Sequence, residues 1–249
     1  MTSMDEVVEL PEDFSGRVRL FPLPDLVVFP HAMQPLHIFE PRYCDMLAES
    51  LATDRLIAMA TLAGGPQATF VSDSQIHPTV CIGKIVSHVE TEDGGHNILL
   101  IGAQRAKILR ELPTNRSFRM ADVEVAVDFQ PVIASAQSQQ LKRSVLDAFA
   151  AVIPPSATVQ HNLHELMAGQ MGLGPITDII AYTLPLGLEA KLALLAEANV
   201  GERARLLIQV LRERQHAAGA TSPAGGAAYI GTASQNPAAD GFPPPFSLN

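Results

Sequence analysis

The chain has 249 residues, enough for one large domain or two small ones, and its 47% apolar content is typical of a globular protein. Its formal net charge of −9, from 17 Lys and Arg against 26 Asp and Glu, repels a phosphate backbone, and no run of basic residues offsets it. The composition therefore argues against nucleic acid as a partner.

The two cysteines, Cys44 and Cys81, stand far apart without a Cys-x-x-Cys unit, which argues against a disulfide framework or a zinc knuckle. We expect both to be small buried apolar residues. Residues 1–14 are acidic where a secretory signal would be basic, and we expect a flexible N-terminus there. Because no stretch approaches about 18 uninterrupted apolar residues, we expect no membrane-spanning segment and a cytoplasmic location.

The segment from Leu20 to Tyr43 alternates prolines with short apolar runs. The runs Leu26 to Phe29 and Leu36 to Phe39 are predicted to be strands. Proline lacks an amide hydrogen and has a fixed φ, so the prolines of this segment are expected at edges, corners or bulges and not in central strands. These prolines are Pro22, Pro24, Pro30 and Pro35.

A helix is predicted to begin at Pro41, because proline suits the first turn, where its missing amide hydrogen costs nothing. Glu40 precedes it and can accept backbone amides at the helix start. The side chains at helical spacing are expected to form the buried stripe. They are Tyr43, Met46, Leu47 and Leu51.

Further strands are predicted at residues 56–62, 80–91, 97–108 and 118–129. The middle two form the clearest hairpin, because the glycines of the connection at 92–96 supply the positive φ that a tight turn needs.

The hydrophobic period changes from two to 3.6 near Ser135, which predicts helices for the second half and an α+β fold with its boundary at residues 131–135. Residues 217–249 are expected to form a disordered tail, since Ala, Gly and Pro fill more than half of it and little apolar surface is available for burial. The helical repeats are Leu141 to Val152, Leu163 to Met167, Ile176 to Ile180, Leu188 to Leu195 and Leu206 to Leu211.

Several short motifs follow one another along the chain: Phe21-Pro-Leu-Pro24, Pro35-Leu-x-Ile-Phe-Glu-Pro-Arg-Tyr43, Ile82-Gly83, Asp93-Gly94, Gly102 with Arg105, and Glu202-Arg203. In this order they resemble the amino-terminal substrate-binding domain of Lon-type proteases, which also occurs alone in bacterial proteins and inside cereblon. The similarity extends over roughly residues 17 to 214. It implies a β-rich, PUA-like pseudobarrel with one helix at 15–131, followed by a helical bundle at 135–216. One departure is His31, where the family often has glycine, so the local loop is expected to differ.

Searching the sequence for catalytic motifs gives mostly negative results. The chain contains no Gly-x-x-x-x-Gly-Lys-Ser/Thr loop, and the ATPase and serine–lysine protease domains of Lon have no counterpart in it. His161 and His164 share a helix face without forming a His-Glu-x-x-His motif, so they are interpreted as surface residues. His31 and His37 are interpreted as ordinary turn and sheet positions. We therefore expect no catalytic residue, no metal and no cofactor.

The candidate binding residues lie in the signature segment. Glu40 and Arg42 flank Pro41, and a structural role at the helix start is favoured over contact with a ligand. The apolar members are expected to be mostly core, but any that border an open groove would suit an exposed apolar peptide. The candidates are Phe29, Pro30, Met33, Leu36, Phe39, Glu40, Arg42 and Tyr43.

The resemblance implies a non-enzymatic module that binds unfolded or degron-bearing polypeptides, with a separate ATP-dependent protease as a candidate partner. Two alternatives stay open. One is an enzyme with an unrecognised site, which would need clustered carboxylates or histidines with shifted pKa values in one cleft. The other is RNA binding by the PUA-like half, against which the acidity and the scarcity of stacking aromatics count, with three Tyr and no Trp.

Overall fold

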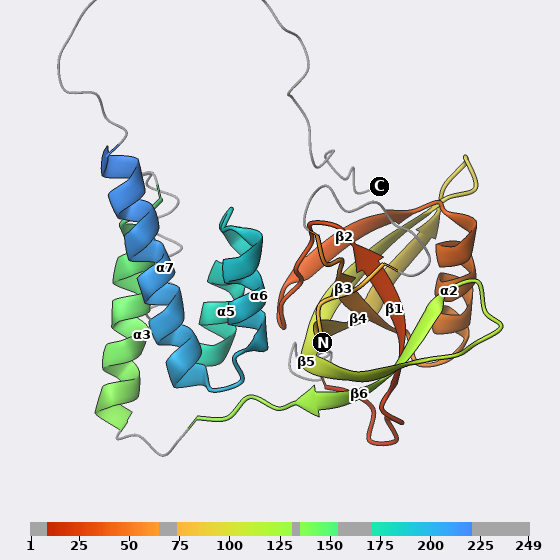
Figure 1. Cartoon of the computed structure of the whole chain (residues 1–249), viewed down its shortest axis with the longest axis horizontal. Helices are drawn as coiled ribbons and strands as arrows, with labels where there is room; N and C mark the ends of the chain where they lie inside the picture. The colour runs from red at the N-terminus through yellow and green to blue at the C-terminus, as the bar shows by residue number, and fades with distance from the viewer. Residues whose placement is uncertain (1–8, 65–73, 131–134, 154–170, 221–249) are drawn as a thin grey trace, which may run out of the picture.

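The computed structural model describes residues 9–64, 74–130, 135–153 and 171–220. Strands make up most of the first half and helices all of the regular structure described in the second half, so the predicted α+β class is confirmed (Figure 1). The change from strand to helix falls between Ala126 and Ser135, close to where the hydrophobic period changes in the sequence.

The β-rich half is one six-stranded sheet in the order β2-β5-β4-β3-β1-β6. A further pairing of β5 with β6 closes the strands from β5 through β4, β3, β1 and β6 into a ring, as the predicted pseudobarrel requires. Strand β5 pairs with β2 along its first half and with β6 along its second half. The strands are β1 (Arg17–Leu23), β2 (Met33–Ile38), β3 (Leu56–Thr61), β4 (Thr79–Glu90), β5 (His96–Leu112) and β6 (Arg119–Ala126).

Alternate residues of the ring strands build two apolar cores. One core fills the inside of the ring, with Leu20, Ala58 and Ile82 among its members. The residues between them, such as Ile57 and Met59, belong to a larger core that includes side chains of the helices. Strand β3 is buried at every position because it contributes to both cores, which explains why its sequence is apolar throughout rather than alternating.

The helix α2 (Pro41–Ala52) begins at Pro41 as predicted, and its buried side chains include Tyr43, Met46 and Leu47. The expected capping by Glu40 is wrong in one respect. Its side chain makes no capping hydrogen bond, and its backbone carbonyl instead accepts the amides of Tyr43 and Cys44, each at 2.9 Å. Cys81 is buried as expected, but Cys44 is only half-buried.

Two predictions for the proline-rich segment are wrong. The run Leu26 to Phe29 forms no strand and enters the core as an irregular segment, so its apolar character reflects burial alone. Pro22 lies within β1, which is an interior strand of the sheet. The sheet tolerates it because β6 pairs only with Arg17 to Leu20, leaving one side of β1 without a strand partner at Pro22.

The turn after Phe29 keeps the backbone conformation that a glycine would favour, although a histidine occupies it. His31 has φ of 66° and donates its amide to the Gly102 carbonyl at 2.8 Å. The expectation that this loop would differ in conformation is therefore wrong, and the hydrogen bond helps to offset a left-handed conformation that costs a non-glycine residue about 1 kcal/mol. In the predicted β4–β5 hairpin, Gly94 supplies the positive φ, at 80°.

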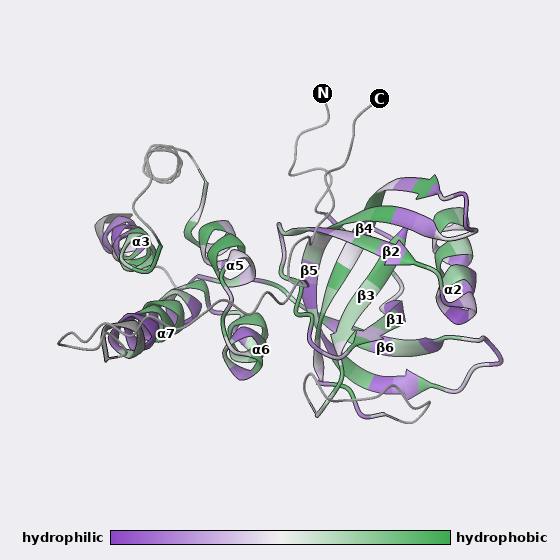
Figure 2. Ribbon diagram, turned by 90° about the horizontal axis from the view of Figure 1, so that it is seen from above, coloured by the Kyte–Doolittle hydropathy of each residue, from purple (hydrophilic) through white to green (hydrophobic). Residues whose placement is uncertain are grey.

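The described helices of the second half are α3 (Ser135–Ala150), α5 (Leu173–Thr183), α6 (Leu188–Ala196) and α7 (Val200–Ala220). Helices α5 and α6 lie between the ring and the α3–α7 pair (Figure 2). Helix α7 runs to Ala220, so the first residues of the predicted tail are helical. Several sequence predictions fall outside the described residues. They concern the rest of that tail, the N-terminus to residue 8, the predicted helix at Leu163 to Met167, and the pair His161 and His164.

A buried charge network ties the helices to the sheet. Arg105 on β5 donates to Asp178 on α5 at 2.7 Å, and Arg203 on α7 approaches the same Asp178 oxygen at 3.1 Å. Both arginines also pair with Asp128, and Arg105 donates to the Leu195 carbonyl at 3.0 Å. Burial raises the pKa of Asp178 to about 6, with both guanidiniums acting in the opposite direction. These three buried side chains fix how the helical half sits on the ring.

Candidate functional site

Phe29 and Pro30 lie in the core and not on an accessible surface. Phe29 is fully buried, and a Cβ on Gly102 would lie 2.0 Å from the Phe29 carbonyl oxygen. Only glycine therefore allows β5 to approach this segment so closely. Together with the His31 amide bond, the contact anchors the turn that leads into β2. These two candidate residues therefore lie in the core and help to position the start of β2.

The outer face of β2 carries the exposed apolar candidates. Met33 is 54% exposed and Phe39, just after the strand, is 67% exposed. His37 lies between them, and its ring stacks with that of Phe39 at 5.8 Å between centroids. The alternate residue Leu36 points to the opposite face and packs against the larger core.

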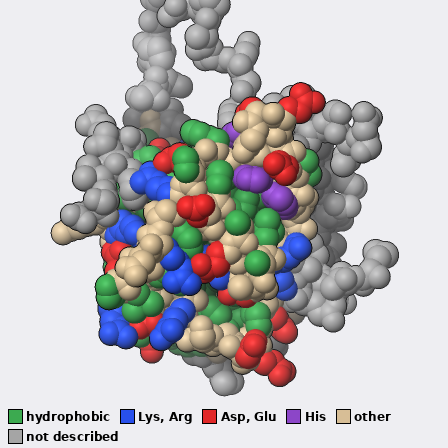
Figure 3. Space-filling view, turned by 90° about the vertical axis from the view of Figure 1, so that its right-hand side faces the viewer, with side chains coloured by type: hydrophobic (Ala, Val, Ile, Leu, Met, Phe, Trp, Pro, Cys, Tyr) green, Lys and Arg blue, Asp and Glu red, His purple; other side chains and the backbone are tan. Residues whose placement is uncertain are grey.

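The exposed surface continues from β2 onto β5 and β4. His37 pairs with Asn97, which in turn pairs with Val89, so the three lie in one row across the strands, and Val89 is 58% exposed. Met33 and Phe39 are six residues apart, which corresponds to about 20 Å along an extended strand. Figure 3 shows one face of the molecule, on which exposed apolar side chains lie beside histidines. We call Met33, His37, Phe39 and Val89 the β2 patch.

The free edge of β2 is largely blocked for pairing with another strand. The Met33 carbonyl accepts the Tyr182 hydroxyl of α5 at 3.0 Å, and the Pro35 carbonyl accepts the Gln34 side-chain amide at 2.7 Å. Pro35 also has no amide hydrogen to offer, as expected for proline on an edge strand. The edge therefore presents side chains to a ligand rather than a row of open backbone groups.

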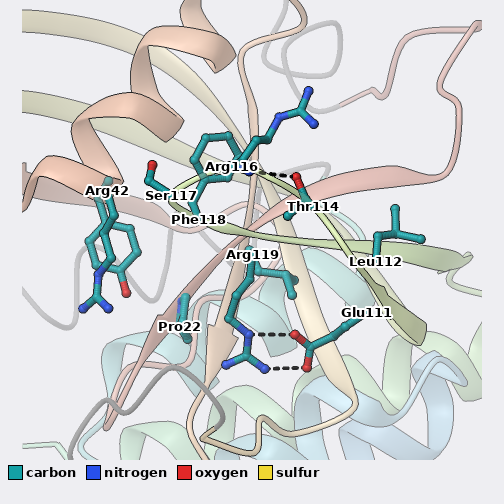
Figure 4. Close-up of a pocket in the computed structure, with 11 residues that line it drawn as sticks. Pro22, Arg42, Glu111, Leu112, Thr114, Arg116, Ser117, Phe118 and Arg119 are labelled. Carbon is teal, nitrogen blue, oxygen red and sulfur yellow. Dashed lines mark hydrogen bonds and ion pairs between the residues drawn. The ribbon is translucent and has the colours of Figure 1, made fainter.

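Arg42 and Tyr43 line a separate cavity of about 280 Å³, which we call the signature cavity (Figure 4). The start of α2 and the β5–β6 connection form its walls, and Arg119 makes a two-point ion pair with Glu111 across it. The Arg42 guanidinium lies 4.6 Å from the centre of the Tyr43 ring and donates to Glu40 at 2.6 Å. The remaining lining residues are Leu20, Pro22, Leu112, Thr114, Arg116, Ser117 and Phe118.

The titratable groups of the signature cavity and beside it are a buried tyrosine and carboxylates paired with arginines. Burial raises the pKa of Tyr43 to about 12, so its hydroxyl stays protonated at neutral pH and is a poor general base. Glu40 and Glu111 are both held by arginines. The cavity is lined by apolar side chains such as Leu112 and Phe118 together with charged ones, and its one lining carboxylate, Glu111, is paired with Arg119.

Sequence reasoning missed a gathering of arginines around this cavity and a neighbouring one, which share the lining residues Leu112, Thr114 and Arg116. The arginines come from β1, α2, β5, β6 and the β5–β6 connection, so they do not form a basic run in the sequence. Carboxylates offset them: Arg17 and Arg110 share Asp122, and Arg116 donates to Glu49 at 2.6 Å. The five arginines are Arg17, Arg42, Arg110, Arg116 and Arg119.

Within the described ranges, no three His, Cys, Asp or Glu side chains are grouped so as to hold a metal ion. The described helices likewise include none that is both long and apolar enough to cross a bilayer. Burial raises the pKa of the Cys81 thiol, which keeps this residue protonated inside the core.

A family model described as the ATP-dependent protease La (LON) substrate-binding domain matches residues 17–213. Two solved structures are similar over most of the chain. One is the Lon N-terminal domain protein from Xanthomonas campestris, with a TM-score of 0.56 at 20% identity, covering 78% of this chain and 97% of that one. The other is the N-terminal domain of Mycobacterium avium complex Lon protease, with a TM-score of 0.58 at 17% identity, covering 79% and 98%. At this identity they support the fold.

Curated relatives are full-length Lon proteases. The chain is 23% identical over 195 residues to Lon protease of Buchnera aphidicola subsp. Schizaphis graminum, covering 78% of this chain and 25% of the relative. It is 27% identical over 212 residues to Lon protease of Azospirillum brasilense, covering 82% and 24%. The chain therefore spans about a quarter of the length of these relatives, and the matched part corresponds to their substrate-binding domain.

Proposed function

Because the chain belongs to the family of the ATP-dependent protease La (LON) substrate-binding domain, we propose that it binds unfolded or degron-bearing polypeptides and catalyses no reaction of its own. The observation that supports this most directly is the β2 patch, where Met33, Phe39 and Val89 are each more than half exposed. Exposed apolar side chains grouped on one face mark interaction surfaces, and methionine adapts to partners of varied shape.

The proposal includes a mode of contact. The polypeptide lies across the β2 patch and is held by its side chains, because the Met33 and Pro35 carbonyls at the β2 edge already accept hydrogen bonds. Such a surface buries limited area, and an unfolded ligand loses conformational entropy on binding, so the affinity is modest, on the order of micromolar. The apolar contact makes binding only weakly dependent on salt.

The test is a titration of a labelled, permanently unfolded protein with the full chain at two salt concentrations, beside a folded control protein. Phe39→Ser removes an aromatic side chain from the β2 patch, and we expect affinity to fall about five- to tenfold. The matched control is Phe129→Ser, because Phe129 is also exposed, at 55%, but lies outside the β2 patch. Equal effects of the two substitutions would contradict the assignment of the patch.

RNA binding is the alternative that a specific observation favours, namely the arginines around the signature cavity. A single-stranded RNA arm in the same titration distinguishes the two functions, because phosphate contacts give affinity that falls steeply with salt. We expect weak RNA binding, since Glu49, Glu111 and Asp122 pair with these arginines. Tight, salt-sensitive RNA binding without affinity for the unfolded protein would overturn the proposal, as would ATP-independent cleavage of the unfolded protein that a substitution in this chain abolishes.

We further propose that the bound polypeptide is passed to a separate ATP-dependent protease. This extension rests on the family membership and on the Lon protease relatives of the matched domain. The measurement is the rate at which a purified Lon-type protease degrades the unfolded protein, with and without the full chain. The extension is supported if the chain changes this degradation rate and if the Phe39→Ser variant changes it less. An unchanged rate contradicts the extension while leaving the binding proposal intact.

A further inference from the structure

Two histidines face each other across the β4–β5 hairpin. His88 lies on β4 opposite Ile98, and His96 lies on β5 opposite Glu90, so the two imidazoles are diagonal neighbours on one face of the paired strands. His88 Nε2 lies 3.1 Å from His96 Nδ1, and the ring centroids are 5.2 Å apart. His88 is exposed and His96 half-buried, so solvent reaches the pair.

This separation matches the spacing of two imidazole ligands on one metal ion. Metal–nitrogen bonds of about 2.0 to 2.1 Å place two adjacent ligand nitrogens roughly 2.9 to 3.4 Å apart, from square-planar to tetrahedral geometry. We propose that His88 and His96 form a two-imidazole site for a divalent transition-metal ion, with Cu²⁺ bound more tightly than Zn²⁺. The site is independent of the polypeptide-binding proposal.

The hairpin holds the two ligands in place before a metal arrives. The strands are paired on both sides of the histidines, and the turn is closed by the Thr91 amide, which donates to the Gly95 carbonyl at 2.8 Å. Coordination needs a lone pair on both facing nitrogens. The one proton shared between them therefore moves through water to an outward nitrogen, either His88 Nδ1 or His96 Nε2, and neither ring gains or loses charge.

The surroundings favour a cation and leave coordination positions open. Glu90 is directly opposite His96, and Glu92 and Asp93 lie in the turn, so the hairpin end is acidic. Since no third side chain of the described ranges completes a metal group with the two histidines, water fills the remaining positions. An open site with imidazole ligands follows the general order of divalent-metal affinity, in which Cu²⁺ exceeds Zn²⁺.

Calorimetric titration of the full chain with Cu²⁺ alone, and separately with Zn²⁺ alone, tests the site. We expect a binding step with one Cu²⁺ per chain that His88→Gln and His96→Gln each remove. His216→Gln is the matched control for loss of an exposed histidine from a different element, and His161→Gln tests the other histidine pair. Retention of the step in His88→Gln, or its loss in His161→Gln, would overturn the assignment.

Thermal unfolding supplies a second readout. A metal that bridges β4 and β5 binds only the folded hairpin, so Cu²⁺ in excess should raise the Tm of the unsubstituted chain. His88 is exposed, and its replacement by glutamine should leave the metal-free Tm unchanged while removing the rise. A rise of the same size in His88→Gln would show that the ion binds elsewhere.

Discussion

The buried charge network makes a strong prediction about stability. Asp178→Ala leaves the guanidiniums of Arg105 and Arg203, both at most 1% exposed, with Asp128 as their only remaining described carboxylate partner. Removing one partner from a buried ion pair typically costs about 3 to 5 kcal/mol, because the remaining charge stays buried without compensation. For a chain of this size, that corresponds to a drop in Tm on the order of 10 °C. Urea and thermal unfolding followed by circular dichroism measure both quantities.

The matched control is Glu202→Ala on α7, which also removes a carboxylate bonded to an arginine. Glu202 pairs with Arg205 on the surface, where both side chains are more than half exposed, so the expected loss is below about 1 kcal/mol. If Asp178→Ala destabilised the protein no more than Glu202→Ala does, the buried network would not be what holds the helices to the sheet.

Three further predictions concern pH, backbone packing and the division between core and surface. Burial raises the pKa of Asp178 from 3.8 to about 6, so between these pH values the folded state retains a proton that the unfolded state has released. The stability that this group contributes therefore falls as pH rises through 6. Asp178→Asn should flatten this dependence of the urea midpoint on pH, measured from pH 4 to 7. Gly102→Ala should lower the Tm sharply, because the added Cβ would meet the Phe29 backbone. Gly187→Ala should leave the Tm nearly unchanged, because the space around Gly187 is open. Equal Tm values for the two variants would contradict the close approach of β5 to Phe29. Phe29→Ala should lower the free energy of unfolding by about 3 to 5 kcal/mol. Phe39→Ser should lower it by less than about 0.5 kcal/mol while weakening polypeptide binding. A loss of stability in Phe39→Ser as large as in Phe29→Ala would show that Phe39 belongs to the core.

The sequence by itself determined the elements that depend on short-range rules. Pro41 and the stripe from Tyr43 to Leu47 predicted α2, because a helix start and a 3.6-residue period are both local properties. The glycine-containing turn predicted the β4–β5 hairpin for the same reason. The resemblance in the signature segment indicated the family that the match over residues 17–213 then established.

Only the tertiary structure decided which apolar residues are accessible. Phe29 and Phe39 have equivalent places in the sequence pattern, each closing a short apolar run, yet one is fully buried and the other is 67% exposed. Likewise the run Leu26 to Phe29 is buried without being a strand, because an apolar run reports burial and not backbone pairing.

The grouping of charged residues was likewise decided by the tertiary structure. Arg105, Asp178 and Arg203 belong to three elements that are far apart in the chain. The arginines around the signature cavity and its neighbour come from four elements and the β5–β6 connection. Helical and strand periods relate a residue only to its near neighbours, whereas ion pairs depend on which faces meet once the ring has closed and the helices have packed. These charge groupings could be found only after the fold had brought their members together.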